Sequence, residues 1–139
     1  MARWETYEAP EGLRYHKEHT WVRLDGASAT IGLTDFAQQL AGEINHIDIP
    51  EVGELLSADK PMGKVETGKW VGKLYAPVTG TVAEVNESIF DDASVANRDP
   101  YGTGYLLSVQ MPDPSHGKDL LDAAAYVEAM KAKKRELGL

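Results

Sequence analysis

Turn-forming residues cut the chain between residues 15 and 110 into short apolar runs, and this pattern constrains the fold more than any other feature. Runs of strand length occupy residues 20–24, 29–33, 44–49, 61–66, 70–75, 81–85 and 105–110. Between them lie turn sequences such as Asp25-Gly26, Pro50-Glu51-Val52-Gly53 and Pro77-Val78-Thr79-Gly80. Short runs that alternate apolar and polar residues are typical of antiparallel strands with one buried face. We therefore expect a mostly β protein.

Two segments have helical signals instead. Thr34 is a suitable N-cap for a short helix over residues 35–40, and Gly42 would end that helix. Asp122 is a suitable N-cap for a second helix that runs to about Leu137, with a basic last turn that complements the helix dipole.

These signals divide the chain into three parts. We expect a loosely structured lead-in over residues 1–13, which Trp4 and Tyr7 fix to the body of the protein. Residues 14–112 would form the β domain, and residues 113–139 a helical appendage packed on the same domain.

A weak internal repeat refines the expected fold. The segment that begins Gly42-Glu43-Ile44 is echoed 38 residues later by Gly80-Thr81-Val82, and each copy leads from a strand into a turn. One irregularity in the alternation of residues 44–49 indicates a β-bulge. Two copies, each too small to bury its own apolar face, predict a flattened β-barrel or sandwich built from intertwined halves.

Composition excludes several classes of function. The chain has 139 residues, no cysteine and a net charge of −8, which disfavours nucleic acid and anionic membranes as partners. No apolar segment has the length of a membrane span or a signal peptide. We expect a soluble, cytoplasmic protein.

Catalytic and metal-binding patterns are lacking. No serine lies in a GxSxG context, and no phosphate-binding glycine loop is present. His16 and His19 are three residues apart, but no third ligand accompanies them at metal-binding spacing. We therefore expect no catalytic residue and no metal, and the chain is not expected to be an enzyme.

The segment from 61 to 75 offers a different kind of site. Two strand-like runs flank Thr67-Gly68-Lys69, and Gly68 is able to adopt a positive φ in a tight hairpin turn. This places Lys69 at the hairpin tip. A lysine there is ordinarily a solvated charge; the alternative is an attachment point for a carried group, which a stiff and exposed turn would present to partner enzymes.

The chain resembles the glycine cleavage H-protein family of lipoyl carriers. The resemblance runs from about residue 15 to 110 through many ordered motifs: His19-Thr20-Trp21-Val22, Ile31-Gly32-Leu33-Thr34-Asp35-Phe36-Ala37, Leu40-Ala41-Gly42-Glu43-Ile44, Pro50-Glu51-Val52-Gly53, Tyr75-Ala76-Pro77-Val78-Thr79-Gly80 and Asn97-Arg98-Asp99-Pro100-Tyr101-Gly102. It implies the lipoyl-domain fold, also called a barrel-sandwich hybrid. It also implies lipoate bound covalently to Lys69, with Glu66 and Gly80 taking part in recognition by the lipoate ligase or lipoyl transferase.

The hairpin tip departs from the family pattern. Glycine cleavage proteins usually read Glu-Ser-Val-Lys-Ala-Ala-Ser, whereas this chain reads Glu-Thr-Gly-Lys-Trp-Val-Gly over residues 66–72. The tip is similar to that of the H-protein-like lipoate-binding proteins of bacterial sulfur oxidation. Biotin carriers, a related family, would have methionines beside the lysine, and Gly68 and Trp70 do not fit that pattern.

The resemblance implies a carrier that moves an intermediate or redox equivalents between enzymes. From the tip, the favoured partners are a heterodisulfide-reductase-like complex and dihydrolipoamide dehydrogenase. The alternative is glycine decarboxylation, in which the protein carries the aminomethyl group between glycine decarboxylase and aminomethyltransferase. A third alternative, from another class, is an unmodified interaction module on a lipoyl-like scaffold.

Two further expectations concern the surroundings of the tip. Lys64 and Lys73 are expected to be ordinary surface lysines of the strands. His19 and Trp21 are candidates for a groove that shelters the loaded arm.

Overall fold

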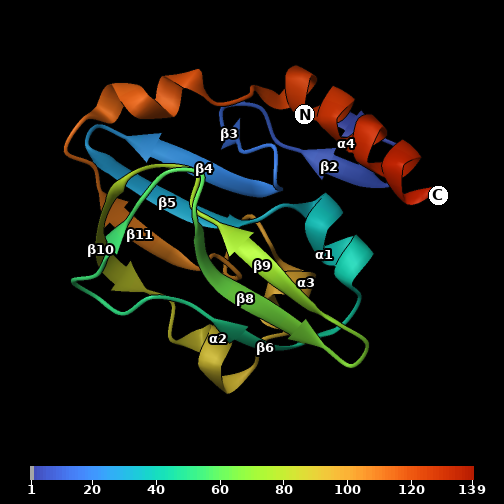
Figure 1. The fold of residues 1–139 in the computed structure, drawn as a ribbon, viewed down its shortest axis with the longest axis horizontal. Helices are drawn as coiled ribbons and strands as arrows, with labels where there is room; N and C mark the ends of the chain where they lie inside the picture. The colour runs from blue at the N-terminus through green and yellow to red at the C-terminus, as the bar shows by residue number, and fades with distance from the viewer. Residues whose placement is uncertain (1) are drawn as a thin grey trace.

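The computed structural model describes residues 2–139, apart from the side chains of His116 and Lys118. Figure 1 shows the arrangement of its elements. The strands are β1 (Ala2–Trp4), β2 (Tyr7–Ala9), β3 (Arg14–Tyr15), β4 (Thr20–Asp25), β5 (Ser28–Leu33), β6 (Ile44–Asp48), β7 (Leu55–Leu56), β8 (Pro61–Thr67), β9 (Val71–Tyr75), β10 (Gly80–Val85) and β11 (Leu107–Gln110). The helices are α1 (Asp35–Ala41), α2 (Ser88–Asp91), α3 (Val95–Arg98), a 3-10 helix (Pro114–Asp119) and α4 (Ala123–Leu137).

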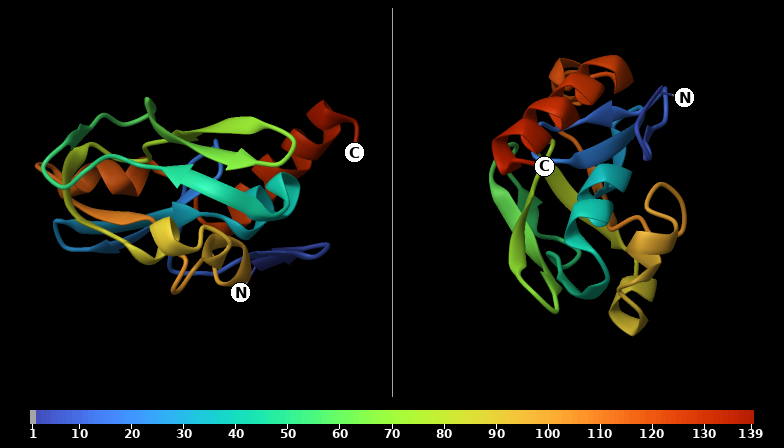
Figure 2. Two further views of the ribbon diagram at one scale, coloured as in Figure 1. Left: turned by 90° about the horizontal axis from the view of Figure 1, so that it is seen from below. Right: turned by 90° about the vertical axis from the view of Figure 1, so that its right-hand side faces the viewer.

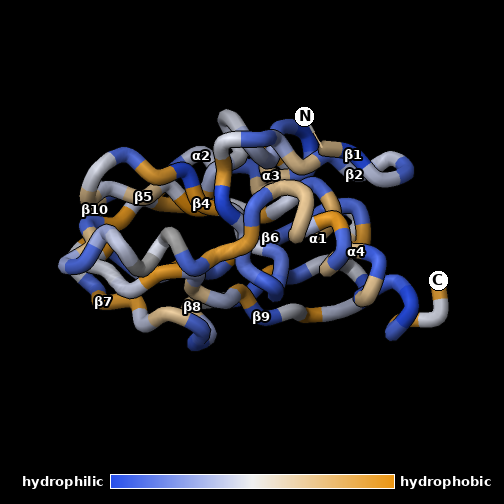
Figure 3. The backbone as a smooth tube through the Cα atoms, turned by 90° about the horizontal axis from the view of Figure 1, so that it is seen from above, coloured by the Kyte–Doolittle hydropathy of each residue, from blue (hydrophilic) through white to orange (hydrophobic). Residues whose placement is uncertain are grey.

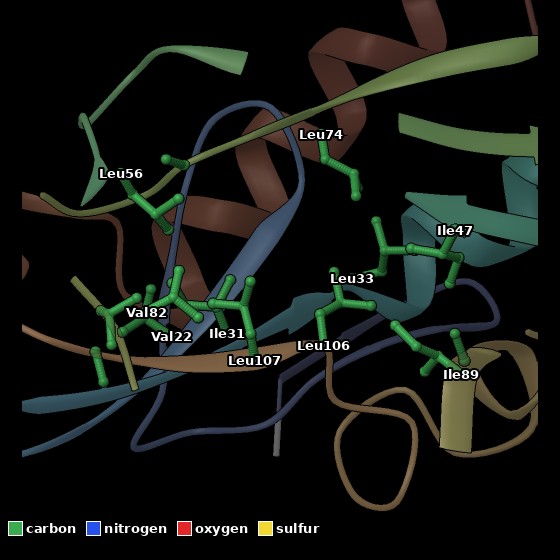
Figure 4. Packing of buried hydrophobic residues seen from close by; sticks show 14 of the residues in the cluster. Val22, Ile31, Leu33, Ile47, Leu56, Leu74, Val82, Ile89, Leu106 and Leu107 are labelled. Atoms are coloured by element: carbon green, nitrogen blue, oxygen red, sulfur yellow. The ribbon is translucent and has the colours of Figure 1, made fainter. Parts of the chain in front are cut away.

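Two sheets pack face to face around the main core. One has the strand order β3-β4-β5-β11-β10-β7 and the other β6-β8-β9, with antiparallel pairing in both. Figure 2 shows them as two layers. Their inner faces meet in a buried cluster that includes Val22, Ile31 and Leu107 from the larger sheet and Ile47 and Leu74 from the smaller (Figure 4). The expected β-rich lipoyl-domain fold is confirmed, and of the two shapes considered it is the sandwich, because each sheet has two free edges.

The internal repeat appears in the structure as a shared irregularity. In the pairing of β6 with β8, the register shifts between Ile44 and His46. In the pairing of β10 with β11, the register shifts between Val82 and Glu84, 38 residues further along the chain. The irregularity predicted in the first copy is therefore confirmed, and the register of the second copy shifts at the equivalent position.

A second cluster of buried side chains joins the C-terminal helix to the outside of the larger sheet. Trp21 and Val22 are adjacent on β4, so their side chains point to opposite faces; Val22 enters the main core and Trp21 the second cluster. Tyr126 and Met130 of α4 are fully buried in this cluster. The helix therefore covers this face of the sheet (Figure 1), while hydrophilic residues gather toward its exposed end (Figure 3).

The prediction of a loosely structured lead-in is wrong. β1 and β2 pair as an antiparallel hairpin, with Arg3 opposite Glu8 and joined to it by an ion pair. Tyr7 is buried in the second cluster beside Phe36 of α1. The strands have three residues each, too few to show a period, and Pro10 and Gly12 follow them. The division at residues 13 and 112 stays a prediction, and Met1 lies outside the described residues.

Other elements agree with expectation or differ at their ends. Thr34 caps α1 by accepting a hydrogen bond from the Ala37 N–H, and Asp122 caps α4 through the Ala125 N–H. The strand expected over 105–110 begins two residues later. The first two residues of the turn expected over 97–102 belong instead to the helix α3. The helix α2, the 3-10 helix and the two-residue strands β3 and β7 were missed because each is at most six residues long.

Candidate functional site

The hairpin of β8 and β9 ends in a turn closed by a side chain. The Thr67 N–H donates to the Trp70 carbonyl over 3.0 Å. The Thr67 hydroxyl accepts from the N–H groups of Lys69 and Trp70 at 3.2 and 3.3 Å. A threonine hydroxyl that binds backbone N–H groups two and three residues ahead fixes a local turn. The side chain of Lys69 is exposed, as predicted for a hairpin tip.

The expectation for Gly68 is not met. Gly68 does not have a positive φ, so the turn makes no use of glycine's conformational freedom. A Cβ at this position would have no neighbour closer than the Asn45 amide nitrogen at 3.9 Å. The hydrogen bonds of the Thr67 hydroxyl close the turn, which needs no residue in the left-handed conformation.

Glu66 and the strand lysines Lys64 and Lys73 lie on the outer face of the hairpin. Lys64 is directly opposite Lys73 in the register, and Glu66 is opposite Val71. The Lys64 ammonium forms a 3.2 Å ion pair with the Glu66 carboxylate, and both side chains are at least one-third exposed. Screening by water makes such a pair worth at most about 1 kcal/mol. Glu66 therefore remains accessible to a partner beside the tip.

Trp70 lies across the neighbouring glycine of β9. A Cβ built on Gly72 would be 1.8 Å from Cζ3 of Trp70 and 2.5 Å from its Cη2. The indole thus occupies the space that any side chain at position 72 would take. Trp70 remains 43% exposed, so this packing leaves much of the ring in contact with solvent.

Two hollows flank Trp70. The first, which we call the tip hollow, has a volume of about 610 Å³ and is lined by Leu40, Glu43, Asn45, Lys69 and Trp70, among others. The second, the helix groove, has a volume of about 500 Å³. It lies between β9, α1 and the end of α4; its lining includes His19, Leu40, Trp70, Gly72, Lys133 and Leu137. Figure 1 shows the hairpin tip, α1 and the C-terminal end of α4 on the same side of the molecule.

His19 borders the helix groove, as expected, and is held by the C-terminal helix. Its Nδ1 is 2.8 Å from the Tyr126 hydroxyl, which is also 2.7 Å from the Thr34 hydroxyl. Burial of the ring, with smaller contributions from Lys133 and His16, lowers the pKa of His19 to about 4. The ring is thus uncharged near neutral pH, and burial also raises the pKa of Tyr126 well above its usual value.

Trp21, the other groove candidate, is in a different place. It is fully buried, and its indole N–H donates to the Pro100 carbonyl over 2.9 Å. Its ring lies against Gly32 on the neighbouring strand, where a Cβ would be 2.6 Å away. The prediction that Trp21 lines the groove is therefore wrong, because the alternation of β4 directs it into the second cluster.

The two histidines considered as metal ligands have separate structural partners. His16 Nε2 lies 2.6 Å from the Asp59 carboxylate, and its Nδ1 accepts the Glu18 N–H. His19 is bonded to Tyr126. Among the residues that the structure describes, no three His, Cys, Asp or Glu side chains are grouped as a metal site.

Gly80 lies far from the hairpin tip. It begins β10, beyond the end of β9 that is remote from Lys69, and the two end residues of β9 alone are roughly 13 Å apart. A Cβ on Gly80 would be 2.7 Å from the Gln110 carbonyl oxygen and 3.0 Å from a methyl of Val109. The close approach of β11 therefore gives Gly80 a structural reason to be glycine. The structure does not bring Gly80 together with Glu66 and Lys69.

The residues of α1 and α4 that border the hollows were not identified from the sequence. Leu40 and Ala41 end the short helix and line both hollows, and Leu137 closes the helix groove from α4. Asn97 fixes the end of α1: its side chain accepts the Ile44 N–H and donates to the Gly42 carbonyl over 2.7 Å. No local pattern identifies such residues, since their neighbours are distant in the chain.

Comparison with known proteins gives one consistent result. A family model described as "Glycine cleavage H-protein" matches residues 13–133. The glycine cleavage system H protein of Chlorobium limicola is 46% identical over 121 residues, covering 86% of this chain and 94% of that protein. The corresponding protein of Bacteroides thetaiotaomicron is 42% identical over 117 residues, covering 84% and 93%. The chain belongs to the glycine cleavage H-protein family.

Structural similarity agrees with this assignment. A crystal structure of a glycine cleavage system H protein from Mycobacterium marinum superposes with a TM-score of 0.77 at 34% identity, covering 94% of this chain and all of the other. Members of the glycine cleavage H-protein family are non-catalytic carriers with lipoate bound covalently to a lysine.

The comparisons bear differently on the two pathways considered from the sequence. They support the glycine cleavage alternative better than sulfur oxidation, which the hairpin tip had favoured. In the described part of the chain, no helix is both long and apolar enough to span a membrane.

Proposed function

We propose that Lys69 is the lipoyl attachment site of this H-protein family member. The observation that carries the proposal is the hairpin tip itself: the lysine is exposed on a turn that the Thr67 hydroxyl fixes. Among the described side chains, none forms a hydrogen bond or ion pair with the Lys69 amine, so a ligase would not have to break a contact to reach it. Glu66 lies three residues before Lys69 on the accessible outer face, and we propose it as the ligase-recognition residue.

The surroundings of Lys69 suit the proposed group. The lipoyl group supplies a disulfide that opens to two thiols, at the end of a long apolar arm. Leu40, Trp70 and Leu137 provide apolar surface within the two hollows beside the tip. The protein would thus supply a stiff attachment point and a partial shelter from water. Tethering makes delivery to each partner effectively intramolecular.

We propose glycine cleavage as the pathway. In this function the chain carries the aminomethyl group between glycine decarboxylase and aminomethyltransferase. A lipoate ligase attaches the lipoyl group to the chain, and dihydrolipoamide dehydrogenase reoxidises the reduced lipoyl group. The names of the relatives support this proposal. The expected cytoplasmic location stays a prediction.

The exchange of labelled bicarbonate with the carboxyl group of glycine tests this function. With glycine decarboxylase present, we expect the lipoylated chain to support the exchange and the Lys69→Arg variant to lose it. Another H protein of the family, also lipoylated, serves as the positive control. If the control is active and the lipoylated chain is not, glycine cleavage is not its pathway.

Sulfur oxidation is a second candidate because of one feature of the tip. Trp70 and Gly72 stand where glycine cleavage proteins usually have small residues beside the lysine, and the indole packed on Gly72 changes the surface that a partner enzyme contacts. In this case the lipoylated chain would bind a heterodisulfide-reductase-like complex and would fail in the exchange assay. Co-purification with the two sets of partner enzymes distinguishes the pathways.

A further inference from the structure

Trp70 occupies the boundary between the two hollows beside Lys69. Trp70, Leu40 and Ala41 line both hollows, whereas Lys69 lines the tip hollow and not the helix groove. The indole on the hairpin and the two α1 residues therefore border the passage from one hollow to the other.

The position of the indole is set by the backbone beneath it. Its six-membered ring fills the space above Gly72, which no other residue type would leave open. A flat apolar surface thus covers Gly72 in β9, three residues after Lys69. The ring is still 43% exposed, so one part of it is available to a further contact.

The length of a lipoyl-lysine side chain matches this surface. Eleven bonds separate the lysine Cα from the sulfur-bearing ring, and at about 1.2 Å per bond of extended chain the arm reaches ~13 Å. Three residues of extended chain, the separation of Lys69 from Gly72, span at most roughly 10 Å. An arm of this length laid along β9 therefore crosses the indole and ends just beyond Gly72, within the helix groove.

We propose that Trp70, seated on Gly72, is a positioning residue that holds the arm of Lys69 against the protein at the entrance to the helix groove. The proposal rests on the proposed function in that Lys69 carries the lipoyl group. An indole face favours both the apolar arm and its sulfur atoms, since sulfur packs well against aromatic rings. The alternative is that Trp70 packs on Gly72 only to stiffen the hairpin.

Accessibility of the reduced arm to an alkylating reagent tests the proposal. Intact-mass analysis first confirms one lipoyl increment that is absent in Lys69→Arg. The arm is then reduced with a phosphine and treated with iodoacetamide. We expect Trp70→Ala to raise the alkylation rate about twofold to tenfold, which is the effect of losing a sulfur–aromatic contact.

Two further variants separate positioning from a general effect on the tip. Gly72→Ala keeps the indole, but the added Cβ takes the space in which the indole packs and displaces the ring. We therefore expect this variant to raise the alkylation rate in the same way. Val71→Ala is the matched control: Val71 is 62% exposed, is next to Trp70 in the chain and lines neither hollow. It is expected to leave the rate unchanged.

Tryptophan fluorescence gives a second readout that keeps Trp70 in place. In Trp4→Phe protein the emission comes from Trp70 and from Trp21, which is buried and distant from the tip. A disulfide in contact with an indole quenches its emission. We expect lower emission in the lipoylated protein than in unmodified Lys69→Arg protein of the same background, and recovery after reduction.

The outcomes separate the two proposals. Absence of the lipoyl increment on Lys69 contradicts the attachment site itself. If the increment is present on Lys69 but the emission is the same with and without the lipoyl group, the proposed role of Trp70 is wrong. Equal alkylation rates for the parent protein and the Trp70→Ala variant lead to the same conclusion.

Discussion

The hydroxyl of Tyr126 lies 2.8 Å from Nδ1 of His19, and this contact ties the C-terminal helix to the loop at the border of the helix groove. The same hydroxyl is 2.7 Å from the hydroxyl of Thr34, which caps α1. One buried side chain therefore connects α4, α1 and the β3–β4 loop, three elements that surround the groove. The helix is part of the architecture of the site, which is a role that the sequence left open.

Removal of the Tyr126 hydroxyl is expected to destabilise the protein. Tyr126→Phe leaves His19 and Thr34 without their shared partner in a buried place, at a cost of about 1–3 kcal/mol in the free energy of unfolding. Urea unfolding measures this change. Tyr75→Phe is the control, because the Tyr75 hydroxyl has no hydrogen bond to any described residue. Equal stability of the two variants would contradict the role given to Tyr126.

Stability is expected to fall as the pH decreases from about 6.5 to about 4. The pKa of His19 is about 4 in the folded protein and 6.5 in the unfolded chain, chiefly because burial disfavours the charged ring. As the pH falls, the unfolded state therefore binds a proton before the folded state does, and the free energy of unfolding decreases by about 3 kcal/mol across this range. Thermal unfolding at a series of pH values measures the loss.

A matched pair of variants assigns this pH dependence. His19 has a φ of 74°, a conformation that asparagine tolerates better than most residues, so His19→Asn removes the titrating ring with little backbone strain. The dependence between pH 6.5 and 4 should become shallower in this variant. It should persist in His46→Gln, since His46 is exposed. A full pH dependence in His19→Asn would show that another group causes it.

Lipoylation is expected at one position. Protein produced with a lipoylation system should gain one lipoyl increment, and Lys69→Arg should lose it. Lys64→Arg and Lys73→Arg should retain it, because neither lysine is at the tip of the hairpin. Intact-mass analysis followed by peptide mapping measures the result. Modification that survives in Lys69→Arg would place the site elsewhere.

Gly80→Ala is expected to act through stability. The added Cβ would lie 2.7 Å from the Gln110 carbonyl oxygen, and relief of this contact would require movement of β10 or β11. Overpacking of this kind typically costs about 1–3 kcal/mol. Circular dichroism during urea unfolding measures the cost, and labelling by the ligase is measured under folding conditions. A variant of unchanged stability that the ligase fails to label would instead support the recognition role expected from the family resemblance.

Local chemistry explains what could be predicted at the hairpin. Both strands of the hairpin, and the exposure of Lys69, follow from alternation and from a short polar link between two apolar runs. The mechanism of the turn was predicted incorrectly, because glycine was taken as its determinant while the Thr67 hydroxyl makes the closing bonds. The lead-in was also misread, since three-residue strands are stabilised by contacts with α1 and α4 and not by their own pattern.

The sequence by itself determined the longer strands of the two main sheets, the capped helices α1 and α4, the irregularity in β6 and the family to which the chain belongs, because these depend on neighbours a few residues apart and on ordered motifs. Only the tertiary structure decided where α4 lies, which face Trp21 occupies, and that Leu40 and Leu137 border one groove. It also placed the indole of Trp70 on Gly72. The physical reason is that these arrangements depend on side-chain packing in three dimensions, between segments up to about a hundred residues apart. Hydrophobic contact is non-directional, and the pattern of one segment does not specify which other segment will cover it.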